Sequence, residues 1–151
     1  MIKYFDISPI ERLKGSDIPL WGKMTPQHMV EHLCLAFKTS NGKIHISDFI
    51  IPAEKLEISK RILMSNRPLP KNFVNTIIGG GLTPLINESL SLAVNELIEE
   101  IENFVKYFES NPAAKPVNAT FGPLNKAEWI HFHKKHLKHH FEQFGLLDIQ
   151  K

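Results

Sequence analysis

Four histidines stand within eight positions near the end of the chain, in the segment FHKKHLKHHFEQFG at 132–145. Neutral imidazole is among the commonest protein ligands for metal ions. On a helix, His136 and His140 stand one turn apart on one face, where two ring nitrogens can bind the same ion at about 2.1 Å each. His133 and His140 are about 10.5 Å apart along the axis, too far to share an ion comfortably. We therefore select His136 with His140, and His133 with His136 is the second choice.

The position of His136 and His140 on the apolar face of this segment indicates that they have a specific role. On a helical wheel at about 100° per residue, His136 and His140 fall within the apolar stripe. Burial of an imidazole without a partner is costly, so two of them on a core face require compensation, which metal coordination provides. Trp129, Gln143 and His133 share this arc. We expect them to line the pocket, with His133 also a candidate catalytic proton carrier.

A third ligand is expected from the helix that follows Thr25-Pro26. His28 and His32 are one turn apart there, and His32 lies deeper, farther from the polar strip. Three neutral imidazoles leave the charge of a divalent ion unneutralised and one position open, as in catalytic zinc sites, where a thiol or water loses its proton near neutral pH. Trp21 and Met24 are further pocket candidates. The polar strip consists of Gln27, Glu31 and Lys38.

Other reactive side chains are interpreted as structural. A hydrogen-bonded core histidine is the alternative for each inward ring, and convergence from two helices argues against it. Cys34 lies about 200° around the helix from His32, so the two cannot form a nucleophile and base pair, and we expect a buried thiol. His131 is assigned to the solvated face and His139 to its boundary. Solvated faces also hold Lys134, Lys135, Lys138, Glu99, Glu100 and Glu102.

The elements that position these residues are predicted to be helices. Ser8-Pro9-Ile10-Glu11 is a capping box with proline at the first helical position, and Gly15 ends this short leading helix. Thr25-Pro26 repeats the start signal before the helical run QHMVEHLCLAFKTS at 27–40. A third helix is predicted from Ala53 to about Met64.

Two further helices are predicted in the second half of the chain. Apolar residues spaced by three or four from Leu90 to Phe108 indicate a long helix behind an Asn87 cap. After a proline-rich loop over 111–123, the capping box Asn125-Lys126-Ala127-Glu128 begins the final helix, which Gly145 ends.

Little of the sequence predicts strands. The segment 44–51 is the only candidate, and Gly79-Gly80-Gly81 is interpreted as a turn between helices, because no strand precedes it and no phosphate-loop ending follows. The fold class is therefore all-α, most economically an antiparallel four-helix bundle with a short leading N-terminal helix, in a single domain over 1–151.

The composition is that of a globular protein without extreme charge. Hydrophobic residues make up 42% and charged residues 23% of the 151 positions, and the net charge of +2 is too small to indicate nucleic-acid binding. The single cysteine, Cys34, excludes an intramolecular disulfide and fits a reducing, cytoplasmic setting. Because the chain has neither a signal-peptide pattern nor about 18 consecutive apolar residues, we expect no membrane partner.

Two blocks carry the proposed ligands: WGKMTPQHMVEHL at 21–33 and FGPLNKAEWIHFHKKHLKHHFEQFG at 121–145. They resemble an uncharacterised subfamily of the DinB-like superfamily of metal-binding four-helix bundles. In that superfamily one histidine ligand comes from an early helix and two from a C-terminal HxxxH, which correspond here to His32, His136 and His140. Where the family pattern has His-Pro before FGPL, this chain has Ala119-Thr120, which calls pocket contacts by that segment into question.

The resemblance implies a divalent metal, often zinc or nickel, and in some relatives reactions that use a low-molecular-weight thiol. Our leading hypothesis is a metal-dependent enzyme that activates a thiol, or a water, towards a small electrophilic substrate. Thiol transfer is slightly favoured over hydrolysis, because no acidic residue is securely placed on an inner face as a general base. The alternative class is a non-enzymatic helical binding module with a vestigial metal site. The expected partner is a small molecule, with no nucleic acid and no membrane, and a homodimer stays open.

Overall fold

Helices make up most of the structure. The computed structural model describes residues 2–47, 51–71 and 82–148. Within these ranges the elements are a short 3-10 helix η1 (Ser8–Arg12), α1 (Pro26–Ser40), α2 (Ala53–Met64), α3 (Leu90–Ser110), β1 (Val117–Asn118), β2 (Gly122–Pro123) and α4 (Lys126–Gln143). The predicted helical class is confirmed.

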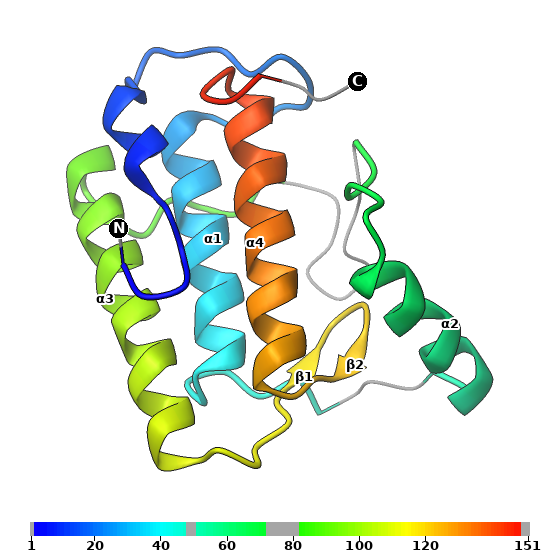
Figure 1. Cartoon of the computed structure of the whole chain (residues 1–151). Helices are drawn as coiled ribbons and strands as arrows, with labels where there is room; N and C mark the ends of the chain where they lie inside the picture. The colour runs from blue at the N-terminus through cyan, green and yellow to red at the C-terminus, as the bar shows by residue number, and fades with distance from the viewer. Residues whose placement is uncertain (1, 48–50, 72–81, 149–151) are drawn as a thin grey trace.

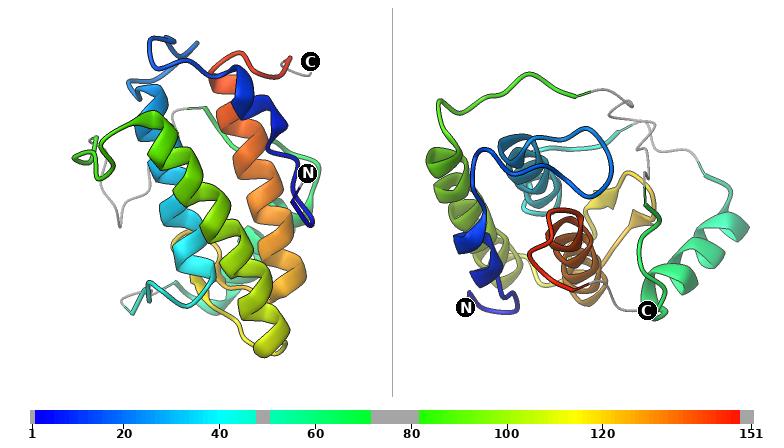
Figure 2. Two further views of the ribbon diagram at one scale, coloured as in Figure 1. Left: turned by 90° about the vertical axis from the view of Figure 1, so that its left-hand side faces the viewer. Right: turned by 90° about the horizontal axis from the view of Figure 1, so that it is seen from above.

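Helices α1, α3 and α4 pack side by side, and α1 contacts both of the others (Figure 1, Figure 2). α1 and α3 run in the same direction, and α4 runs in the opposite one. α2 stands apart on the other side of α4, which it contacts. The packed centre is therefore formed by three helices with α2 as a flank, and the antiparallel four-helix bundle stays a prediction.

Large apolar side chains fill this centre. Cys34 is also buried there, as predicted, and its thiol donates to the Ala93 carbonyl at 3.7 Å. α2 adds only Leu63 to the buried apolar residues of the described segments. The largest fully buried side chains are Trp129, Phe5, Phe37, Phe104, Phe108, Phe141, Met29, Leu33, Leu63, Leu97, Ile101 and Leu124. None of the described helices is long and apolar enough to cross a membrane.

Polar contacts also hold α2 on α4. Lys135 Nζ donates to the Ile62 carbonyl at 3.2 Å, and Lys60 Nζ lies 3.9 Å from Glu128 Oε2. Lys135 is therefore half-buried rather than solvated, whereas Lys134 and Lys138 are exposed as predicted.

Two helix starts follow the predicted signals. Thr25 Oγ1 accepts the His28 backbone N–H at 3.2 Å at the start of α1. At the start of α4, Asn125 Oδ1 accepts the Glu128 backbone N–H and Glu128 Oε1 accepts the Asn125 backbone N–H, both at 2.9 Å. This reciprocal pair satisfies two backbone donors that the helix itself cannot.

Two other starts differ from the prediction. Ser89, not Asn87, caps α3, since its side chain accepts the Leu92 backbone N–H at 3.1 Å. The expected capping box at Ser8 is absent: Ile7 precedes η1, with no side-chain cap, and the Ser8 N–H donates to Asp6. Asn87 instead donates to Glu31, and Asp6 accepts the N–H that a capping box at Ser8 would use. Sequence spacing alone cannot rank such competing contacts.

In the described connecting segments, one small hairpin is present. The loop predicted over 111–123 includes β1 and β2, paired antiparallel with Asn118 opposite Gly122. The strand candidate at 44–51 is not a strand over 44–47, and its residues 48–50 lie outside the described residues. The glycine turn at 79–81 also lies outside them.

Two glutamates predicted on polar faces are buried instead. Glu31 is 8% exposed and accepts the backbone N–H groups of Ile86 and Asn87 at 2.8 and 2.9 Å. Burial disfavours its ionised form, but the hydrogen bonds from Asn87 and Ile86 outweigh burial and lower its pKa. Glu100 is 2% exposed and accepts from Asn41 Nδ2 at 2.7 Å and from Lys43 Nζ. These carboxylates tie both ends of α1 to α3 and to the segment before it.

Candidate metal centre

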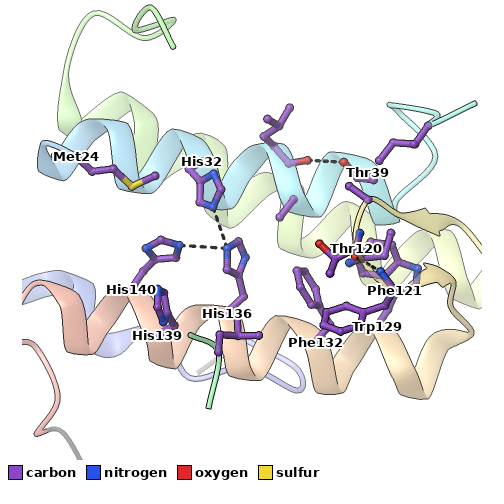
Figure 3. A pocket seen from close by; sticks show the side chains of 16 residues that line it. Met24, His32, Thr39, Thr120, Phe121, Trp129, Phe132, His136, His139 and His140 are labelled. Atoms are coloured by element: carbon purple, nitrogen blue, oxygen red, sulfur yellow. Dashed lines mark hydrogen bonds between the residues drawn. The ribbon is translucent and has the colours of Figure 1, made fainter. Parts of the chain in front are cut away.

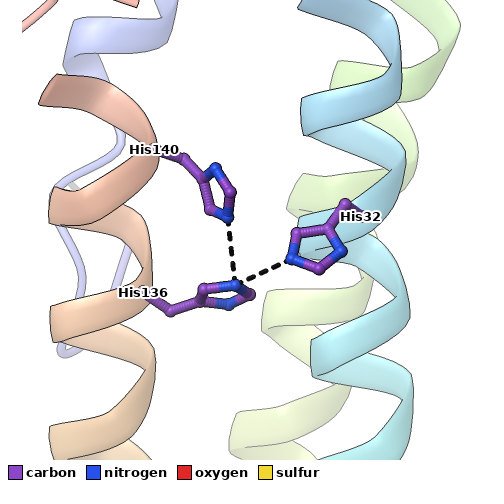
Figure 4. A group of neighbouring side chains, drawn as sticks. All are labelled: His32, His136 and His140. Atoms are coloured by element: carbon purple, nitrogen blue, oxygen red, sulfur yellow. Dashed lines mark hydrogen bonds between the residues drawn. The ribbon is translucent and has the colours of Figure 1, made fainter. Parts of the chain in front are cut away.

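The structure brings three imidazoles from two helices to one point (Figure 4). His136 Nε2 lies 2.9 Å from His32 Nε2 and 3.1 Å from His140 Nε2. One ligand atom from each ring lies within 4.8 Å of the others, which is close enough to hold one ion. We call His32, His136 and His140 the histidine cluster.

Local sequence explains half of this convergence. His136 and His140 are four residues apart on α4, so their side chains project from the same face. His32 comes from the facing surface of α1, and its ring centroid lies 4.8 and 4.9 Å from those of His136 and His140. The two helices run in opposite directions, and their packing sets the register that brings His32 opposite the pair.

Burial keeps these imidazoles neutral. Burial, followed by the charge of His139, lowers the pKa of His32 to about 4. Burial is also the largest cause of the lowered pKa of His136 and of His140, and the neighbouring imidazoles lower both further. Neutral rings expose nitrogen lone pairs, the form that binds a metal ion.

The cluster fits a divalent ion in its donor type and spacing. Two nitrogens at about 2.1 Å from one tetrahedral ion stand about 3.4 Å apart. The observed separations of 2.9 and 3.1 Å are a few tenths of an ångström shorter, which small ring rotations can accommodate. Each neutral imidazole has one N–H donor and one acceptor nitrogen. Without an ion, hydrogen bonds between the three Nε2 atoms can therefore pair two of them and leave the third without a partner in the cluster.

A hydrogen bond supports the orientation of His140. Its Nδ1 lies 2.7 Å from Gln143 Oε1, and the Gln143 amide donates in turn to the Trp21 carbonyl at 3.0 Å. The second bond fixes the amide so that its oxygen accepts from His140 Nδ1–H, which leaves the Nε2 lone pair directed at the cluster. His136 Nδ1 is buried with no hydrogen-bond partner in the described part of the chain.

A cavity of about 130 Å³ opens beside the cluster, between α1, α4 and the β1–β2 hairpin (Figure 3). Most of its wall is apolar. Its lining residues are Met24, His32, Leu35, Ala36, Thr39, Ile46, Leu69, Asn118, Ala119, Thr120, Phe121, Trp129, Phe132, His136, His139 and His140.

The predicted pocket residues take different places. Trp129 and Met24 line the cavity, and Trp129 Nε1 donates to the Pro116 carbonyl at 3.0 Å. Gln143 is buried and is not among the described lining residues; it contacts His140 instead. Trp21 also lies off the described wall, where its ring packs edge-on against His139 at 5.5 Å.

His133, the predicted proton carrier, is fully buried among aromatic rings. It stacks on Phe37 at 3.7 Å with an interplanar angle of 9° and on Trp129 at 5.2 Å. Its Nε2 lies 2.8 Å from Ser40 Oγ, and Nδ1 has no partner within the described residues. Burial holds its pKa well below the ordinary value. His133 does not line the cavity in the described structure, and its catalytic role stays a prediction.

The other histidines do not join the cluster. His28 Nδ1 contacts Thr25 Oγ1 at 2.6 Å at the start of α1. His131 is half-buried, and its Nε2 is covered, so the predicted solvated position is wrong. His139 is partly buried at the boundary, as predicted, and it lines the cavity.

Several wall residues have no signal in the sequence. Ala119 and Thr120, the pair that differs from the DinB-like pattern which the sequence resembles, both line the cavity. They lie in the turn between β1 and β2, which folds this segment back onto α1 and α4. Nothing in the sequence singles out Thr39, Asn118 and Phe132, because ordinary residues of these types carry no motif.

Known proteins add no further identification. Comparison of the chain with family models, curated proteins and solved structures finds no match. The functional interpretation therefore depends on the histidine cluster and its cavity.

Proposed function

We propose that the protein is a divalent-metal-dependent enzyme in which His32, His136 and His140 hold the ion. One observation carries this proposal: three neutral imidazoles direct Nε2 to one point at the end of a cavity. Three neutral ligands leave a divalent ion its charge and an open position, as in catalytic zinc sites. When bound, such an ion acts as a Lewis acid that lowers the pKa of a thiol or a water.

The cavity wall favours thiol activation over hydrolysis. None of the described lining residues is an aspartate or a glutamate, so no carboxylate general base is placed beside the cluster. A thiol is acidic enough to react as its thiolate without such a base, whereas attack by water is commonly assisted by one. The protein's own part is to position the ligands, exclude water with the apolar wall and seat a small electrophile.

The finer assignments rest on the resemblance. The blocks at 21–33 and 121–145 support a DinB-like four-helix bundle with zinc or nickel as the ion and a low-molecular-weight thiol as cosubstrate. The single cysteine, buried within α1, supports a reducing, cytoplasmic setting. Fold analogy alone identifies neither substrate nor metal.

Elemental analysis of the purified protein tests the metal assignment. We expect about one divalent ion per chain, lost in His136→Ala and His140→Ala. His131→Ala, on the same helix but outside the cluster, is the control and retains the ion. Full metal content in both ligand variants would reject the assigned site.

Activity assays separate the remaining classes. The metal-loaded protein is assayed with glutathione, bacillithiol or mycothiol and a small electrophile, and in parallel with ester and amide panels. Thiol-dependent turnover that disappears in His136→Ala supports the proposal. Thiol-independent hydrolysis supports the metallohydrolase alternative. A metal-free protein whose melting is unchanged by chelation is a binding module.

A further inference from the structure

The cavity beside the histidine cluster has two chemically different ends (Figure 3). The cluster occupies one end, and Thr39 and Thr120 lie at the other. Asn118 lies with them, since its Oδ1 accepts the backbone N–H of Thr120 at 2.8 Å. The wall between the two ends includes the apolar side chains of Leu35 and Phe132.

The end away from the cluster offers uncharged hydrogen-bonding groups. Asn118 Oδ1 also accepts the Phe121 backbone N–H at 3.1 Å, and these two bonds fix the orientation of the amide. Nδ2 is then a donor with no partner within the described residues. Thr39 Oγ1 donates to the Leu35 carbonyl at 2.9 Å and retains its acceptor lone pairs. For the Thr120 hydroxyl, the described chain provides no partner.

The described residues of the wall carry no side chain with a permanent charge. Among its described residues there is no aspartate, glutamate, lysine or arginine, and the titratable side chains are four histidines. At the end away from the cluster, and throughout the metal-free cavity, an ionic group would lose hydration without gaining a counter-charge, which is strongly unfavourable. The part of a ligand that fills this end is therefore expected to be uncharged.

The size of the cavity limits the apolar part of a ligand. Its volume is about 130 Å³, and a dry apolar cavity of about 150 Å³ holds benzene. The enclosed part of a ligand is therefore comparable to one six-membered ring. A charged tripeptide-sized thiol is too large to be enclosed and would present only its sulfur end to the cluster.

We infer that the substrate is a small uncharged molecule with an apolar body of about one ring and an amide, carbonyl or hydroxyl group at the end opposite the reacting atom. The polar group hydrogen-bonds to Asn118 and Thr120, and the body packs on Leu35 and Phe132. The reacting atom then faces the histidine cluster. This assignment of the reacting end rests on the proposed function.

Three ligands of the same shape and different charge test the inference: benzamide, benzoate and benzamidine. Their binding is measured by isothermal titration calorimetry in EDTA, on the full chain without metal. We expect benzamide to bind at millimolar concentration, and benzoate and benzamidine to bind at least about ten-fold more weakly. Equal binding of either ion, or no benzamide binding, overturns the inference.

Two substitutions test the polar end. Asn118→Asp keeps an oxygen for the turn and replaces the amide donor by an anionic acceptor, so the preference should change from benzamide to benzamidine. Thr120→Val keeps the shape and should weaken benzamide about three- to ten-fold. Thr83→Val, at an exposed position outside the cavity, should leave the affinity unchanged. Unchanged benzamide affinity in both cavity variants would overturn the inference.

The outcome is independent of the metal. A protein that lacks a bound ion but selects benzamide would refute the enzyme proposal and support the description of the cavity. Full metal content with equal binding of all three ligands would support the metal site and refute the description of the cavity. Metal analysis of the same preparations distinguishes the two failures.

Discussion

Two histidine sites lie one turn apart on the same face of α4 and differ in almost every property. His133 is sealed between Phe37 and Trp129, with one ring nitrogen 2.8 Å from Ser40 Oγ. His136 and His140 instead direct Nε2 at His32, beside a cavity. Both sites hold neutral imidazoles because of burial, so charge does not distinguish them.

The facing helix makes the difference. α1 presents an aromatic ring and a hydroxyl to His133, which satisfy a core histidine by stacking and one hydrogen bond. It presents another imidazole, His32, to His136. The three Nε2 atoms of the cluster cannot all be paired by N–H···N hydrogen bonds, and a bound cation would satisfy their lone pairs. Residue type and helical face therefore do not define a histidine's role.

Removal of His32 should abolish metal binding. His32→Ala leaves two imidazoles from one helix, and we expect less than about a tenth of an ion per chain, because two ligands do not form a closed site. The matched control is His28→Ala, one turn earlier on α1 and outside the cluster. Metal content by elemental analysis provides the measurement, and equal loss in both variants would contradict the assignment.

Removal of His133 should cost stability and spare the metal. His133→Ala leaves a void among aromatic rings, and we expect the free energy of unfolding to fall by about 3 kcal/mol. Urea denaturation in EDTA measures the loss. Elemental analysis of the same variant should show the wild-type metal content, and loss of the ion would place His133 in the metal site.

Gln143 should tune the cluster through His140. Gln143→Met removes the acceptor for His140 Nδ1–H, and we expect metal affinity to fall about 10- to 100-fold. Gln143→Glu keeps an acceptor oxygen and should retain most of the affinity. Competition titration with a zinc chelator gives both values. Identical affinities for wild type and Gln143→Met would show that this hydrogen bond has no part in metal binding.

Acid should destabilise the metal-free protein, in part through His133. Burial lowers the pKa of this imidazole in the folded state, so the unfolded chain takes up the proton first. Its contribution is complete above the unfolded pKa of about 6.5 and is lost as pH falls below it, by up to about 1.4 kcal/mol per pH unit.

The comparison variant for this effect is His133→Phe, which fills the same space without a titratable group. Urea denaturation in EDTA at several values between pH 7 and pH 5 should give it a shallower dependence than wild type. Parallel pH profiles would mean that His133 does not take up a proton on unfolding.

Much of the local structure follows from the sequence. α2 spans Ala53–Met64 as predicted, and the capping box of Asn125 and Glu128 forms both expected hydrogen bonds. Helix periodicity also placed His136 and His140 on the inner face of α4. These features depend on residues within about one turn of each other, which a sequence displays directly.

Contacts between distant segments did not follow from the sequence. Glu31 and Glu100 were assigned to polar faces, yet each is buried against backbone or side-chain donors from another segment. Gln143 was expected in the cavity and instead connects His140 to the Trp21 carbonyl. In each case at least one partner lies far away along the chain, and no local pattern encodes it.

The sequence by itself determined the main helices and the inward faces of His136 and His140 on the last of them. Only the tertiary structure decided that His32 meets His136 and His140, that His133 is sealed among aromatic rings, and that the hairpin turn at Ala119-Thr120 forms part of the cavity wall. The physical reason is the distance along the chain over which each effect acts. Helical periodicity acts over a few residues, whereas the register between helices results from packing the whole core.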